Sequence, residues 1–293
     1  MRRPGTVNDG AGREPVFFTG FTPASHRGAS RQFPENTLDA FRRALEILPG
    51  SLIETDVRLT ADGAVIVIHD EMLDHNTNGA GPVRDTALGG IRALDAGYGI
   101  TFDGGESFPF RGRGFRIPLL SEALVAFPNA KFSIDIKDNE FDAAEKVMDI
   151  IKEKGAAARV IMGSFHDRIV RLVRKKYGGM FTSFSKNEVI RFLAAQKLRV
   201  SRLIQLRGDA MLIPEFVGGA GHEYQGKGPA RGFRVITPGL IGAAHRRGIP
   251  VLAWTINRPE NMRRLIGWGI DGIVTDRIDA LKEVMADKGM RPQ

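Results

Sequence analysis

Apolar positions recur along most of the chain with two different spacings. Short apolar runs predict strands at 52–57, 65–69, 131–136, 160–165, 251–256 and 270–275, with weaker candidates at 181–184 and 203–206. Apolar residues at helical spacing predict helices at 37–48, 141–154, 168–176, 187–196 and 259–266. Strand–helix repetition of this kind is typical of a parallel α/β fold.

Two architectures fit the repetition. The length of 293 residues favours a closed (β/α)8 TIM barrel, and an open doubly wound sheet is the alternative. No Gly-x-Gly-x-x-Gly or Walker-type loop opens a predicted helix, which argues against dinucleotide and nucleotide binding.

The connection between the strands at 52–57 and 65–69 is too short for a parallel crossover. It contains Asp62-Gly63, a strong turn signal, so the second strand should fold back against the first and return His69 towards Glu54 and Asp56. Residues 71–118 lack periodicity, and we interpret them as a small insert or lid after the second strand. The expected domain covers 16–285, with a disordered tail at 1–15 and a C-terminal tail at 286–293.

Composition narrows the class of protein. The net charge is +8 and the pI is about 9.9, but the basic residues are dispersed as pairs on predicted helices, so we do not expect nucleic-acid binding. The chain has no cysteine, which excludes disulfides and thiolate metal sites. No apolar stretch is long enough for a signal peptide or a membrane span, so we expect a cytoplasmic protein without stable membrane insertion.

Carboxylates gather at two predicted strand ends. Glu54 and Asp56 stand at positions i and i+2 of one strand, so both point to one side of it. Asp135 ends another strand, with Lys137 on the same face. Three carboxylates suit a hard cation such as Mg²⁺ or Ca²⁺, and Lys137 could bind phosphate beside it. Solvated acids, or a simple Asp135–Lys137 pair, are equally good interpretations of each motif alone.

Two histidines occupy similar positions. His26 precedes Arg27, whose planar guanidinium matches a phosphate, and His69 ends the strand at 65–69. Two imidazoles can supply the general acid and base of a phosphoryl displacement near neutral pH. A single histidine at a strand end is more often structural, and the surrounding acids and Arg27 shift that balance.

Other polar residues near these motifs have structural as well as functional interpretations. Asn36 is expected to cap the helix at 37–48, which leaves Glu35 without a structural reason. Trp254 and Asn257 end a late strand and could hold the non-reacting half of a substrate, although Trp254 could equally be a core residue. His166 lies just past another strand end and is a weaker candidate.

Taken together and in order, these residues resemble the glycerophosphodiester phosphodiesterases. The resemblance spans residues 25 to about 280 and rests on the motifs His26-Arg27-Gly28, Pro34-Glu35-Asn36-Thr37, Glu54-x-Asp56-Val57, Thr60-Ala-Asp62-Gly63, His69-Asp70, Ile117-Pro118-Leu119-Leu120, Ser164-Phe165, Trp254-Thr255-Ile256-Asn257 and Gly272-Ile-Val-Thr275-Asp276. Each motif is short, but the combination is highly specific. It implies a (β/α)8 barrel with its site at the C-terminal strand ends, where a divalent cation assists hydrolysis to glycerol 3-phosphate and an alcohol.

The resemblance also implies roles for individual residues. His26 and His69 look like the acid–base pair, and Arg27 and Lys137 like phosphate contacts. Trp254 is similar to the aromatic residue on the glycerol side, and we add Glu35 and Asn257 as expected substrate contacts. The implied metal ligands are Glu54, Asp56 and Asp135, although the third acid is commonly Glu in the family. The first strand, ahead of His26, is less uniformly apolar than usual.

The expected mechanism is in-line displacement at phosphorus, with a cyclic phosphate first if the substrate's own glycerol hydroxyl attacks. Two alternatives remain. The same site could act on lysophospholipids or other phosphodiesters, or the barrel could bind phosphate or phospholipid head groups without turnover. The sequence does not indicate an oligomeric state.

Overall fold

The strands of the described chain form a closed parallel barrel. The computed structural model describes residues 17–198, 200, 204–218 and 232–290. Within these residues eight parallel strands form the wall: β1 (Thr22–His26), β2 (Leu52–Leu59), β4 (Phe132–Ile136), β5 (Val160–Gly163), β6 (Phe181–Thr182), β7 (Met211–Pro214), β10 (Val251–Trp254) and β11 (Gly272–Thr275). Their order is β6-β5-β4-β2-β1-β11-β10-β7, and a parallel bridge between Ser183 and Ala210 joins its two ends.

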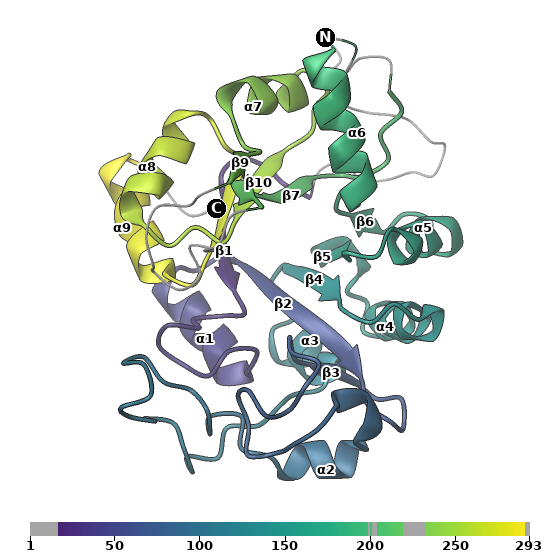
Figure 1. Cartoon of the computed structure of the whole chain (residues 1–293), viewed down its shortest axis with the longest axis vertical. Helices are drawn as coiled ribbons and strands as arrows, with labels where there is room; N and C mark the ends of the chain where they lie inside the picture. Colours follow the sequence, from purple (N-terminus) through teal and green to yellow (C-terminus); the bar gives the residue numbers. More distant parts are fainter. Residues whose placement is uncertain (1–16, 199, 201–203, 219–231, 291–293) are drawn as a thin grey trace.

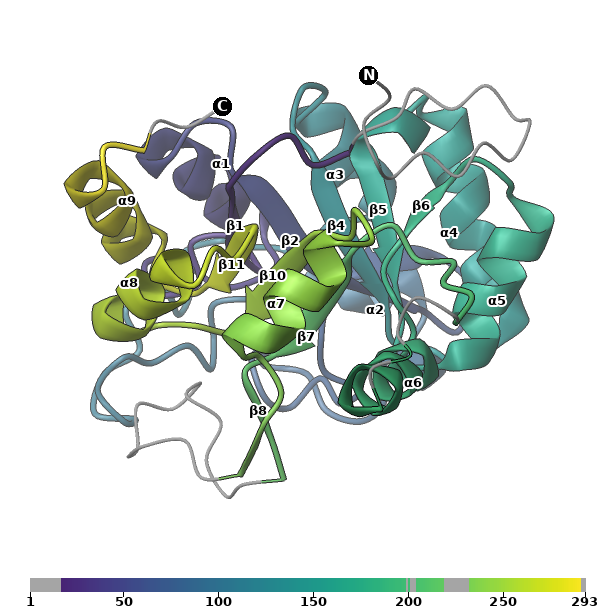
Figure 2. The ribbon, with the colours of Figure 1, turned by 90° about the horizontal axis from the view of Figure 1, so that it is seen from above.

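Helices cover the outside of the barrel (Figure 1). After each wall strand comes one long or short α-helix, namely α1 (Leu38–Ile47), α3 (Leu120–Ala126), α4 (Phe141–Glu153), α5 (Asp167–Lys176), α6 (Lys186–Lys197), α7 (Pro238–His245), α8 (Pro259–Gly267) and α9 (Ile278–Asp287). A short 3-10 turn, η2 (Ala157–Arg159), precedes β5. Figure 2 shows α4, α5 and α6 on one side of the strands and α1, α8 and α9 on the other. The predicted (β/α)8 barrel is confirmed, and the open sheet is excluded because its edges meet.

The barrel interior is filled by side chains from alternate strand positions. A buried cluster combines inward residues of seven wall strands with two aromatic residues that precede β1: Phe17, Phe18, Ala24, Leu52, Ile161, Phe181, Ala210, Leu212, Leu252, Trp254 and Val274. Since side chains alternate along a strand, the residues two and four positions after this layer also point inward. On β1 and β2, and directly after β11, those positions are His26, Glu54, Asp56 and Asp276. They lie at the C-terminal end of the barrel, which we call the mouth.

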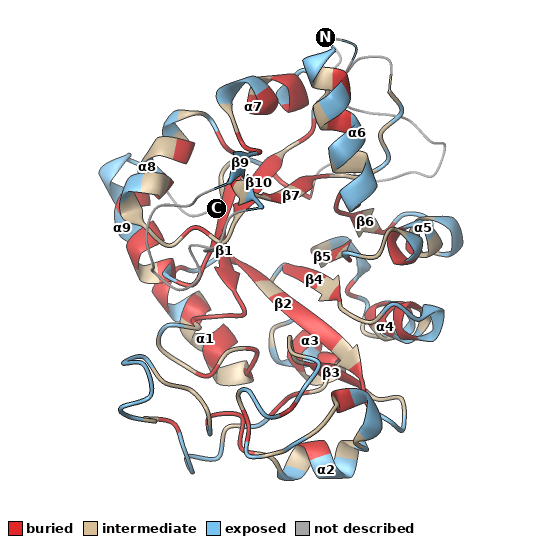
Figure 3. Ribbon diagram, in the orientation of Figure 1, coloured by how far each residue is buried: buried red, intermediate tan, exposed pale blue. Residues whose placement is uncertain are grey.

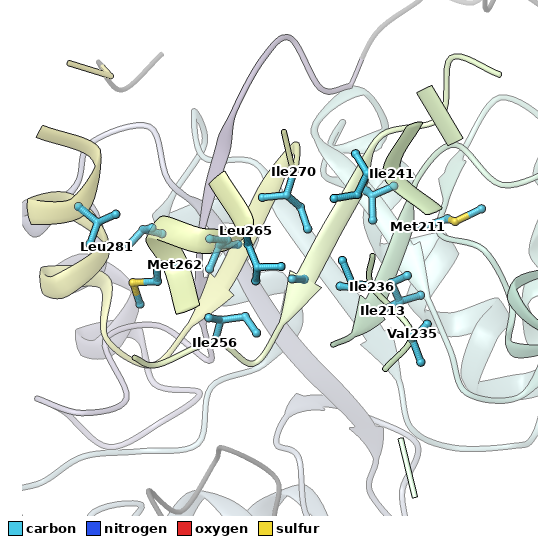
Figure 4. Packing of buried hydrophobic residues seen from close by; sticks show 14 of the residues in the cluster. Met211, Ile213, Val235, Ile236, Ile241, Ile256, Met262, Leu265, Ile270 and Leu281 are labelled. Carbon is cyan, nitrogen blue, oxygen red and sulfur yellow. The ribbon is translucent and has the colours of Figure 1, made fainter. Parts of the chain in front are cut away.

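Two larger apolar clusters lie between the strands and the helices. One packs β7, β10 and β11 against α7, α8 and α9, and Figure 4 shows its members Met211, Ile213, Val235, Ile236, Ile241, Ile256, Met262, Leu265, Ile270 and Leu281. The other packs β2, β4 and β5 against α3, α4 and α5. Figure 3 shows the resulting pattern: the wall strands are mostly buried, and the helices carry both buried and exposed residues. The helical spacing of apolar residues that the sequence showed at 141–154 and 168–176 gives the faces of α4 and α5 that pack in this cluster.

The antiparallel arm is also confirmed. β3 (Val65–Val67) pairs antiparallel with β2, with Val57 opposite Val67. The insert that follows contains η1 (Val83–Asp85) and α2 (Leu88–Ala93) and has a small core of its own, made of Ile66, Leu73, Val83, Ile91, Ala96 and Ile117. This core includes the arm residue Ile66, so the insert is fixed to the barrel through β3.

Several elements differ from the predictions. The strand expected at 203–206 is absent from the described residues 204–206, and the wall strand lies further on, at Met211–Pro214. A two-stranded ribbon of β8 (Phe216–Val217) and β9 (Phe233–Arg234) follows it. α9 runs to Asp287, past the expected domain end at 285, whereas the tail at 1–15 lies outside the described residues. No described helix is both long and apolar enough to cross a membrane.

Candidate active site

The first side of the site is the tight turn after β1. His26 ends this strand and is almost fully buried, and the backbone N–H of Arg27 donates to the Glu54 carbonyl across 2.9 Å. Arg27 and Gly28 both adopt left-handed φ angles, of 54° and 84°. A Cβ on Gly28 would lie 2.7 Å from the carbonyl carbon of Ala40 in α1, so only glycine lets the helix approach the turn this closely.

Carboxylates line the neighbouring strands, as predicted. Glu54 and Asp56 lie on the inward face of β2, and Asp135 of β4 is directly beside Asp56 in the register. The Lys137 ammonium joins the two strands, with its Nζ 2.8 Å from Asp56 Oδ1 and 2.7 Å from Asp135 Oδ2. The pairing of Asp135 with Lys137, one of the alternatives, is therefore present, but Lys137 also pairs with Asp56.

Burial and neighbouring charges make the two β2 acids unequal. Burial, together with the nearby charge of Asp56, raises the pKa of Glu54 to about 7. Burial also opposes ionisation of Asp56, but the charges of Lys137 and Arg27 outweigh it and hold the Asp56 pKa well below its usual range. Asp56 is thus an ionised carboxylate between two cations, whereas Glu54 is the acid whose charge is poorly compensated.

The expected cap at Asn36 is wrong. Thr37 is the N-cap of α1, and its side chain accepts from the Ala40 N–H, whereas Asn36 has a left-handed φ of 57°. The Asn36 side chain turns into the site, where Nδ2 donates to Asp56 across 3.2 Å and Oδ1 accepts from Thr55 across 2.7 Å. Threonine can cap a helix nearly as well as asparagine, and asparagine tolerates the left-handed region better, which explains the exchange.

Glu35 contacts Arg27. The Arg27 Nη1 donates to Glu35 Oε1 across 2.8 Å, and the Arg27 Nε lies 3.3 Å from Asp56 Oδ2. The guanidinium is therefore held on two sides by carboxylates. This contact with Arg27 supplies a structural explanation for Glu35, which the sequence had left without one.

His26 is held by a carboxylate from the last wall strand. Its Nδ1 lies 2.6 Å from Asp276 Oδ1, and its Nε2 is 4.0 Å from Glu54 Oε2. Asp276 also accepts from Ser30, across 3.0 Å, and from the Asn257 side chain, across 2.7 Å. In the sequence Asp276 was only the last residue of a family motif, and Asn257 was expected to contact the substrate. In the structure the side chain of Asn257 is turned to Asp276.

These contacts shift the pKa values of both His26 and Asp276. Burial opposes protonation of His26, but the charge and hydrogen bond of Asp276 outweigh it, so the His26 pKa is raised. Burial likewise opposes ionisation of Asp276, but His26, Asn257 and Ser30 outweigh it and lower the Asp276 pKa. An ionised Asp276 accepts a hydrogen bond from the Nδ1–H group of His26, so Nδ1 carries a proton in this tautomer.

The arm brings His69 close to Asp56 of β2. The Ile68 N–H donates to the Asp56 carbonyl across 3.0 Å, and the Arg58 Nε donates to the His69 carbonyl across 2.9 Å. The His69 Nδ1 lies 2.7 Å from Asp70 Oδ1. Each of the two predicted histidines therefore has its Nδ1 fixed by a carboxylate, and both stand beside the β2 acids.

An aromatic pair lies at the mouth. The ring of Trp254, half-buried at the end of β10, meets the exposed ring of Phe165 edge-on, with 5.9 Å between centroids. The Lys137 ammonium is 5.5 Å from the centre of the Phe165 ring. Trp254 also packs against the interior cluster, so it is both a core residue and a residue of the mouth. His166 contacts the Lys137 carbonyl through Nε2, at 3.1 Å.

The acids suit a metal ion chemically, although their side chains are turned to cations of the protein. Within the described residues no three histidine or acidic side chains are grouped so as to hold a metal ion. Lys137 holds Asp56 and Asp135, and Glu54 is the carboxylate that a divalent cation would stabilise most. Carboxylate oxygens are the ligands that a hard cation prefers, so the three acids at the ends of β2 and β4 fit such an ion by their chemistry.

The chain is similar to one protein family and to several known proteins. Residues 26–280 match the model of the glycerophosphoryl diester phosphodiesterase family. A glycerophosphodiester phosphodiesterase of Caldanaerobacter subterraneus is 35% identical over 280 residues, covering 90% of this chain and 98% of the relative. A human lysophospholipase D is 26% identical, covering 89% and 85%. The structure of an Oleispira antarctica phosphodiesterase in complex with its product sn-glycerol 3-phosphate is similar, with a TM-score of 0.69, 20% identity and coverage of 92% and 98%.

Proposed function

Because the chain belongs to the glycerophosphoryl diester phosphodiesterase family and is thus a phosphoric diester hydrolase, we propose that it hydrolyses glycerophosphodiesters to sn-glycerol 3-phosphate and an alcohol. The observation that carries the proposal is the pair His26 and His69. Their Nδ1 atoms are held by Asp276 and Asp70, and both rings stand beside the inward acids of β2. Paired imidazoles with fixed tautomers are what proton transfer at a phosphodiester needs.

We propose one divalent cation, Mg²⁺ or Ca²⁺, held by Glu54, Asp56 and Asp135. The adjacent register of Asp56 and Asp135 supports this, as does the pKa of Glu54, which burial and the charge of Asp56 raise to about 7. Such a cation, when bound, would polarise the phosphoryl oxygens and neutralise their charge. Asp135 is shorter than the glutamate that is common at this position in the family. A substitution at Asp135 is therefore the most direct test of the proposed ligands.

The basic residues complete the phosphate site in this proposal. The Arg27 guanidinium and the Lys137 ammonium each contact one carboxylate oxygen of Asp56, and both would neutralise the non-bridging oxygens of the phosphate. Glu35 and Asn257 would act indirectly, through Arg27 and Asp276. Trp254, together with Phe165, would line the glycerol side of the site.

Proton transfer in this proposal is shared by the two imidazoles. One accepts the proton of the attacking hydroxyl as its oxygen bonds to phosphorus, and the other donates a proton to the leaving oxygen as its bond to phosphorus breaks. When the attacking group is the glycerol hydroxyl of the substrate, the alcohol leaves first and a cyclic phosphate remains. Water then opens the ring, the imidazoles exchange roles, and sn-glycerol 3-phosphate is released.

The experiment is a hydrolysis assay with glycerophosphocholine and Mg²⁺ that measures sn-glycerol 3-phosphate and choline. We expect activity that EDTA abolishes and added Mg²⁺ restores. His26→Ala and His69→Ala should each lower kcat roughly 10²–10⁴-fold. His245→Ala is the control. His245 is the last residue of α7 and pairs with Asp271, which precedes β11 and lies away from the mouth. Wild-type turnover in either site variant would exclude the histidine pair.

A second substrate class has support of its own. The lysophospholipase D relative matches most of this chain, and the ring of Phe165 is exposed beside the mouth, where it could contact an acyl-bearing glycerol. The same assay with lysophosphatidylcholine separates the two classes by their kcat/KM. Binding of either compound without release of choline would instead favour a non-catalytic barrel.

A further inference from the structure

A third histidine is connected to the site through Asp70. The two oxygens of this carboxylate contact two imidazoles, since Oδ1 lies 2.7 Å from His69 Nδ1 and Oδ2 lies 2.5 Å from His75 Nδ1. The His75 side chain is 69% exposed and belongs to the insert, whereas that of His69 is 33% exposed. The three side chains form one hydrogen-bonded row from the surface to the mouth.

This row fixes the orientation of His69. Burial opposes ionisation of Asp70, but its hydrogen bonds with both imidazoles outweigh it and lower the Asp70 pKa. An ionised carboxylate only accepts hydrogen bonds, so both Nδ1 atoms carry a proton and the Nε2 of His69 is the atom that exchanges protons. Asp70 could rotate about its side-chain bonds if only His69 held it. The second contact, with His75, removes that freedom.

The insert holds His75 by its backbone. A Cβ on Gly99 would lie 2.3 Å from the His75 carbonyl oxygen, and the Gly99 N–H donates to the Asn76 carbonyl across 3.2 Å. The Asn76 side chain donates to Glu35, across 3.3 Å, and Glu35 in turn holds Arg27. Two consecutive residues of the insert thus reach both sides of the site, His75 towards His69 and Asn76 towards Arg27.

We propose that His75 is a positioning residue that acts through Asp70 to fix the tautomer and orientation of His69. This inference rests on the proposed function, in which His69 transfers a proton. His75 itself does not contact the reacting atoms. The role of the insert is then to stabilise the active geometry of the mouth, and not only to cover it.

Two substitutions separate the hydrogen bond from the bulk of the ring. His75→Phe keeps a ring and removes the Nδ1–H donor, whereas His75→Asn keeps an N–H donor at the δ position. We expect His75→Phe to lower kcat about 10-fold with little change in KM, because His69 then spends only part of its time in the productive orientation. His75→Asn should restore kcat to within about 3-fold of the wild type.

The imidazole signals give a readout that needs no substrate. Long-range proton–nitrogen NMR spectra should show His69 as a single Nδ1–H tautomer in the wild type and in His75→Asn, and as a tautomer mixture in His75→Phe. His245→Phe is the matched control, because His245 is also an exposed partner of an aspartate, at 2.7 Å, but on α7. It should leave kcat and the His69 signals unchanged.

Failure of the inference differs from failure of the proposed function. A wild-type enzyme that hydrolyses glycerophosphocholine, with wild-type kcat and His69 signals in His75→Phe, would overturn the role of His75 alone. A wild-type enzyme without hydrolysis would overturn the proposed function. In that case a changed His69 tautomer in His75→Phe would still support the positioning contact, and an unchanged one would overturn it.

Discussion

At the scale of single residues, the pair of Asp276 with His26 is the buried charge contact whose effect on stability is simplest to test. The pKa of Asp276 is lowered in the folded protein, so its ionisation contributes stability above the usual aspartate pKa, and this contribution is lost as the pH falls through the folded value. Asp276→Asn should therefore lower the free energy of unfolding by about 2 kcal/mol at pH 6. The loss should shrink towards pH 3.

Urea denaturation at the two pH values measures the difference. Asp39→Asn serves as the control, since Asp39 pairs with Arg42 at 2.9 Å on the exposed face of α1, where ion pairs contribute little. Equal destabilisation by Asp276→Asn at pH 6 and at pH 3 would contradict the assignment of its charge.

The sequence indicated most of the acidic and basic residues of the candidate site but, apart from the Asp135–Lys137 pair, not their partners. His26 and Asp276 are 250 positions apart, and the pairing of β1 with β11 brings them together. The wrong N-cap assignment has a local cause, because both Asn36 and Thr37 can cap a helix. In the structure the Asn36 side chain donates to Asp56, and Thr37 is the N-cap. Side-chain chemistry is legible in the sequence, whereas pairing between strands requires the fold.

At the scale of elements, the turn from β1 into α1 depends on Gly28. Gly28→Ala adds a Cβ 2.7 Å from the Ala40 carbonyl carbon at a φ of 84°, so α1 must move away from the turn. We expect a loss of about 3 kcal/mol in the free energy of unfolding, and a lower kcat because His26 and Arg27 flank the same turn. Thermal unfolding and the hydrolysis assay measure the two effects.

Gly155 provides the matched control for that substitution. It also has a left-handed φ, of 60°, but a Cβ there would meet nothing within 4 Å. Gly155→Ala should cost about 1 kcal/mol from the backbone conformation alone, with kcat unchanged. A similar stability loss in both variants would mean that the approach of α1 to the turn is not the cause.

Elements with a strong local signal were predicted, and those defined by their neighbours were not. The arm β3 follows from Asp62-Gly63 and its apolar run. β7 was missed, because it ends at Pro214 beside a Gly-rich region that hides its period in the sequence. The weaker candidate at 181–184 was confirmed, although β6 spans only Phe181–Thr182. A wall strand can be this short because strands on both sides fix it.

At the scale of the whole molecule, the three acids of the site predict a stability that depends on divalent cations. A ligand that binds only the folded protein stabilises it by about 2.7 kcal/mol at 100 times its Kd. We therefore expect Mg²⁺ or Ca²⁺ to raise the Tm and EDTA to reverse the change. Asp56→Asn should abolish the response, while Asp39→Asn, on the surface of α1, should retain it. An unchanged Tm across a wide cation range would contradict the proposed ligands.

The way the wall closes between β6 and β7 has a consequence for where the barrel opens locally. In the described residues this seam consists of the Ser183–Ala210 bridge with a few hydrogen bonds around it, whereas β2 pairs with β4 along a continuous register from Ile53 to Val57. Amide deuteration should therefore be faster at Phe184 than at Ile53, because local opening begins where the fewest bonds must break. The strands β4, β2, β1 and β11, which carry the acids and His26, lie on the far side of the ring from that seam. Local opening at the β6–β7 seam should therefore leave the proposed catalytic groups in position.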